Sequence, residues 1–67
     1  MRKVYVVNDE DQADEKVYFV ENEHQFHHEK VFVVENEDQA DCKVFAVDNE
    51  HQADRKVYGV YDEQQAF

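Results

Sequence analysis

The chain has 67 residues, which is enough for one domain, but a domain this small buries only about 60% of the surface of its unfolded chain. Its formal net charge of −10 argues against binding to nucleic acid or to an anionic membrane, because both are recognised through Lys and Arg. Ser and Thr are absent and there is a single Gly, which removes serine nucleophiles and glycine-rich phosphate loops as candidate chemistry. Twelve Val without any Leu or Ile favour strands over helices.

The first predicted strand covers residues 3–7, directly after Met1 and Arg2. No apolar segment typical of a signal peptide or a membrane span occurs before or after it. Cys42 is the only cysteine, so the chain cannot form an internal disulfide. These features together lead us to expect a cytoplasmic protein.

This strand opens the first of five tandem units of about thirteen residues. Each unit begins with Lys, Val, an aromatic residue, a variable apolar residue and Val, so both faces of the strand are apolar and need cover. The variable place ranges in size from Gly59 to Phe19, which indicates that large and small side chains face each other there. The units cover residues 3–15, 16–29, 30–42, 43–55 and 56–67, and the second has one extra residue near His27 and His28.

A polar segment with a fixed pattern follows each strand. An Asn or Asp at the seventh place precedes a Gln by three residues, which is the spacing of a capping box. A Glu lies between them, where the dipole of a helical turn favours it. The Gln residues are Gln12, Gln25, Gln39, Gln52 and Gln65. Each strand is therefore predicted to lead into about one helical turn.

The connections are too short for an ordinary parallel sheet. Only about eight residues separate consecutive strands, whereas a crossover between neighbouring parallel strands takes about a dozen or more. A meander, a narrow solenoid and a closed ring remain open, and we favour a closed or nearly closed ring because it removes exposed strand edges. Such a ring could close within a monomer or through the terminal strands of a homodimer.

Tandem units of the form Lys-Val-aromatic-x-Val that close on Gln-Ala-Asp resemble the septoil-knot family of small repeat proteins. The closing triplet stands at 12–14, 39–41 and 52–54, while the second unit has Gln-Phe-His-His at 25–28 and the fifth ends in Gln-Ala-Phe. The resemblance extends over residues 3–66. It implies a small β-rich toroid with a torus knot, of five or three crossings in a chain of five units. Some family members carry the name of a cytotoxin family, which implies a toxin-like effector as an alternative function.

Lysines and glutamates recur once in each unit. The lysines are Lys3, Lys16, Lys30, Lys43 and Lys56, and the glutamates are Glu10, Glu23, Glu37, Glu50 and Glu63. We expect a ring of ion pairs that fixes register, because exposed pairs contribute only about 0–1 kcal/mol each to stability. The carboxylates also suggest a hard-cation site, but residues 8–11 lack the Gly and the spacing of an EF-hand loop.

Four histidines are the candidate metal ligands. His24 and His27 are three residues apart, which places them on one side of a helical turn, and with His28 they could bind Zn²⁺, Ni²⁺ or Cu²⁺. His51 occupies the place of His24 two units later. We favour ordinary surface histidines over a metal site, and we expect no cofactor.

Cys42 is the one residue with nucleophilic potential. Cys42 is the last residue of its unit, and other units have Glu15, Glu29 and Arg55 at this position. This variation indicates a solvated position that tolerates any polar residue. Without a concave site beside it, we expect no catalysis. The sequence therefore predicts a non-catalytic structural or interaction module with an acidic surface and an unknown protein partner, with a toxin-like effector or a metal-binding module as the alternatives.

Overall fold

The computed structural model describes residues 1–24 and 28–61, and each unit contributes one strand to it. The strands are β1 (Arg2–Val6), β2 (Glu15–Phe19), β3 (Glu29–Val33), β4 (Cys42–Ala46) and β5 (Arg55–Val60). Single turns of 3-10 helix follow three of them, namely η1 (Glu10–Gln12), η2 (Glu37–Gln39) and η3 (Glu50–Gln52). In the part of the chain that the structure describes, no helix is long and apolar enough to cross a membrane.

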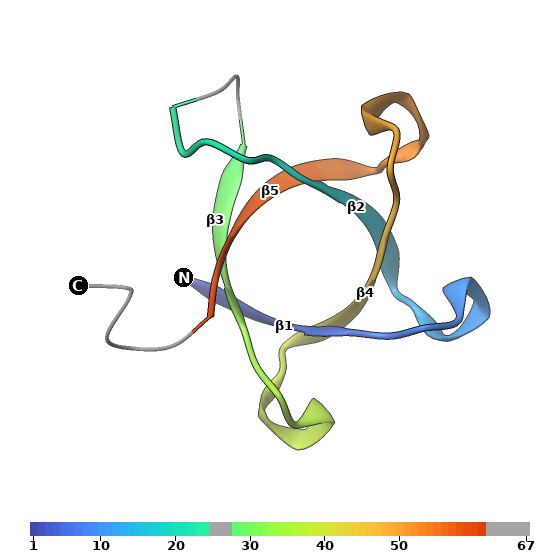
Figure 1. The fold of residues 1–67 in the computed structure, drawn as a ribbon. Coiled ribbons are helices and arrows are strands. Elements are labelled where there is room, and N and C mark those ends of the chain that lie inside the picture. Colours follow the sequence, from blue (N-terminus) through green and yellow to red (C-terminus); the bar gives the residue numbers. More distant parts are fainter. Residues whose placement is uncertain (25–27, 62–67) are drawn as a thin grey trace.

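All strand pairs are parallel, and they close into a barrel in the order β1-β3-β5-β2-β4. The ring is visible in Figure 1, with the helical turns projecting from its outside. The predicted closed toroid of strand-plus-turn units is therefore confirmed, and the meander and the solenoid are excluded. A barrel has no edge strand, so no row of unpaired backbone groups is left among these five strands.

The chain advances two places round the ring at every step. In the ring, β4 lies between β1 and β2, so the chain skips one strand position between these two consecutive strands. The connections to β3, β4 and β5 each skip one position in the same direction. Each step follows a strand of the ring and then a turn that projects outside it (Figure 1). The described residues make four of these steps, from β1 to β5, so the chain passes more than once round the barrel axis.

The strands are offset from one another by two residues at each interface. Arg2 is paired with Val31, and Glu29 with Val57, so the first residue of one strand meets the third of its neighbour. A constant offset in so narrow a barrel requires strongly tilted strands. It also brings residues at the same place of every unit to the same height, so that the barrel interior is built from rings of five side chains.

The middle ring is the hydrophobic core. It consists of the second residue of each unit, which is at most 1% exposed: Val4, Val17, Val31, Val44 and Val57. Phe19, Val33 and Cys42 pack against it. Valine is a small β-branched side chain, which suits an inward-facing strand position in a barrel of only five strands. The predicted contrast in size at the fourth place is confirmed, because a Cβ added to Gly59 would lie 3.1 Å from Cε1 of Phe19.

Two of the three 3-10 turns begin with the predicted side-chain cap, whereas Asn36 makes no side-chain cap hydrogen bond at the start of η2. The carboxylate of Asp9 accepts from the backbone N–H of Asp11, and the side chain of Asn49 accepts from that of His51. Gln12 contributes through its backbone N–H, which donates to the Asp9 carbonyl over 3.0 Å. This is a backbone bond, in which the repeated Gln side chain has no part.

Candidate functional site

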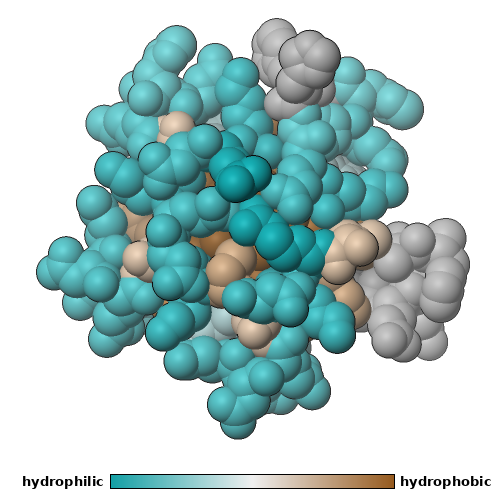
Figure 2. Space-filling view, turned by 180° about the vertical axis from the view of Figure 1, so that it is seen from behind, coloured by the Kyte–Doolittle hydropathy of each residue, from teal (hydrophilic) through white to brown (hydrophobic). Residues whose placement is uncertain are grey.

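The two mouths of the barrel differ because all strands run in the same direction. The mouth at the strand N-termini is lined by the residue that precedes each repeated lysine, which faces inward together with the valine ring. These five side chains are Arg2, Glu15, Glu29, Cys42 and Arg55. Figure 2, seen from behind, shows strongly hydrophilic side chains lying across a hydrophobic centre.

Arg2 contacts both glutamates of this mouth and also Cys42. Its guanidinium donates to both carboxylate oxygens of Glu29, over 3.1 and 3.0 Å, and to Oε1 of Glu15 over 2.7 Å. Arg55 donates to the second oxygen of Glu15 over 2.8 Å, and its Nη1 lies 3.8 Å from Glu29. Burial alone would lower the pKa of Arg2, but the hydrogen bond to Glu15 and the surrounding negative charges raise it. The network therefore holds Arg2 charged within the N-terminal mouth.

The order of charges round the mouth explains why the network is satisfied. In ring order the residues are Arg2, Glu29, Arg55, Glu15 and Cys42, so positive and negative groups alternate. Five places cannot alternate completely, and the neutral thiol occupies the place left over. If the strands followed one another round the barrel in the order of the sequence, Glu15 and Glu29 would instead be neighbours.

The expectation of a solvated place holds for only part of this ring. The side chains of Arg55 and Glu29 are 55% and 37% exposed, and Cys42 is half-buried, but only 15% of the Glu15 side chain and 25% of that of Arg2 are exposed, and both are committed to ion pairs. The sequence-based strand began one residue too late, at the lysine, and this excluded the inward-facing residue before it. The opposite charges at 2, 15, 29 and 55 were the available signal, but their pairing depends on a strand order that the repeat alone does not reveal.

Cys42 is part of the same ring. Burial raises the pKa of its thiol, and the neighbouring Arg2 opposes this effect only in part. Nη1 of Arg2 lies 3.4 Å from the sulfur. A thiol with a raised pKa is protonated at neutral pH and is a weak nucleophile.

Lysines of the outer face pair with glutamates of the preceding turn. In the described residues four such pairs occur: Lys16–Glu10, Lys30–Glu23, Lys43–Glu37 and Lys56–Glu50, at 3.8, 2.7, 3.6 and 3.6 Å. Lys3 lies on the same face of β1, and Glu63 and Gln65 lie outside the described residues. The hydrogen bond from Lys30 lowers the pKa of Glu23, and the carboxylate in turn raises the pKa of Lys30.

The Asp of each Gln-Ala-Asp triplet forms two hydrogen bonds that join its connection to a neighbouring strand. Asp41 accepts from the backbone N–H of Lys3 through its side chain over 2.9 Å and donates its own N–H to the Lys3 carbonyl over 2.8 Å. Asp14 and Asp54 make the same two bonds to the lysines of β4 and β2. In the sequence this Asp stands out only as part of the closing triplet, and nothing within one unit indicates its hydrogen bonds to a lysine 29 or 38 residues away.

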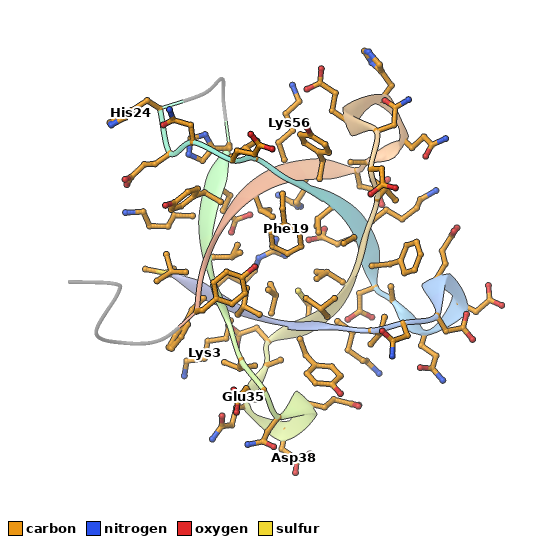
Figure 3. All side chains as sticks on the ribbon, in the orientation of Figure 1. Lys3, Phe19, His24, Glu35, Asp38 and Lys56 are labelled. Atoms are coloured by element: carbon orange, nitrogen blue, oxygen red, sulfur yellow. The ribbon has the colours of Figure 1, made fainter. Side chains whose placement is uncertain are left out.

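The predicted metal ligands are distributed over two turns. His24 is exposed on the turn after β2, next to Asn22, whose side chain accepts from its N–H (Figure 3). His28 precedes β3, and its ring is 6.2 Å from that of Tyr58. His51 lies in η3, whereas His27 and Gln25 lie outside the described residues. The residues that the structure describes contain no group of three or more potential metal ligands.

The mouth at the strand C-termini is apolar. It is lined by the fourth residue of each unit: Val6, Phe19, Val33, Ala46 and Gly59. Figure 3 shows Phe19 directed into the ring. Val6 is 37% exposed and Ala46 is also exposed, so this end of the core is in contact with solvent.

Comparison with known proteins gives one match. A family model described as the 7(1) septoil knot domain matches residues 1–66, which is nearly the whole chain. No curated protein and no solved structure matches.

Proposed function

Since the chain belongs to the septoil-knot family, we propose that it is a non-catalytic structural or interaction module, a knotted ring that keeps its shape without any ligand and offers its acidic surface to a partner. The observation that carries this proposal is the closed barrel itself. Five parallel interfaces complete the sheet, a valine ring fills it, and the charges at one mouth neutralise one another.

The charge distribution supports an interaction role. The lysines lie at the base of the turns, where glutamates pair with them, and Arg2 and Arg55 are used inside the N-terminal mouth. The turns carry more carboxylates than there are cations outside the ion pairs just described. Asp9, Asp11 and Asp38 are exposed on these turns. A rigid framework with an excess of outward carboxylates attracts basic surfaces and resists self-association.

Thermal unfolding with and without EDTA, followed by circular dichroism, tests the proposal when combined with light scattering on the same sample. We expect a monomer with the same melting temperature in both buffers. A melting temperature that falls in EDTA would support the metal-binding interpretation of the histidines, and a folded species found only as a dimer would refute closure within one chain.

A further inference from the structure

We draw no further inference here: the strongest candidate, the apolar mouth of the barrel at the C-termini of the strands, where Val6 and Ala46 are exposed beside Phe19, carries nothing because, among the residues that the structure describes, nothing shows what covers it.

Discussion

The ion-pair ring at the N-terminal mouth leads to a quantitative prediction for Glu15. Replacing it by Gln keeps the shape of the side chain but removes a charge that Arg2 and Arg55 both contact, at 2.7 and 2.8 Å. A Gln amide has one acceptor oxygen, and its NH₂ group cannot accept from a guanidinium, so one of the two hydrogen bonds to a charged group is lost, and such a bond contributes about 1.5–3 kcal/mol. The Arg55 bond is the weaker of the two, because 55% of that side chain is exposed and water screens it.

We therefore expect Glu15→Gln to destabilise the fold by about 2 kcal/mol. In a domain of this size, that lowers the melting temperature by about 8–16 °C. Glu10→Gln is the matched control: it also removes one negative charge, but from a pair 3.8 Å apart whose Glu is 58% exposed. Its expected cost is below about 0.5 kcal/mol.

Urea and thermal unfolding of the two variants, monitored by circular dichroism at low and high salt, give the comparison. The reasoning fails if both variants lose the same stability, or if the effect of Glu15→Gln disappears in high salt. Either result would mean that the mouth is screened as the outer surface is, and that the ring has no special role.

Three further outcomes follow from packing and titration. Gly59→Val is expected to cost about 1–3 kcal/mol in urea unfolding because it overfills the space beside Phe19, and Phe19→Ala in the same chain should relieve most of that cost, whereas additive losses would contradict the contact. Val44→Ala, in the fully buried ring, is expected to cost about 2–3 kcal/mol and the half-buried Val47→Ala clearly less, while equal costs would argue against the central core. The pKa of Glu23 is lowered in the folded state, so its contribution is present at neutral pH and is lost as the pH falls through the range in which it protonates. The melting temperature of Glu23→Gln should thus lie below that of the parent at neutral pH and equal it in acid; a constant difference would refute the assignment.

The sequence predicts local structure and the closed ring well, and for physical reasons. Each unit carries its own strand pattern and its own cap, and both act over a few residues. The short connections exclude an ordinary parallel sheet. Among the arrangements that remain, a closed ring is favoured because it leaves no exposed strand edge.

The charged mouth could not be predicted in the same way. The contact between Arg2 and Glu29 depends on which strands are neighbours and on a two-residue offset, and neither is encoded within one unit. Once the strand order is given, the alternation of charges follows directly. The same charges disfavour the sequential order, because that order would place Glu15 beside Glu29.

The step of two places also limits how such a protein can grow. Moving by two round a ring visits every position only if the number of positions is odd, as it is with five strands. A sixth unit would return the path to its start after three strands, with half of the ring unfilled. A duplication of one thirteen-residue unit is therefore incompatible with this winding, while a duplication of two units is compatible with it. Lineages that keep the winding should differ in length by pairs of units, and an engineered chain with one added unit should abandon the ring.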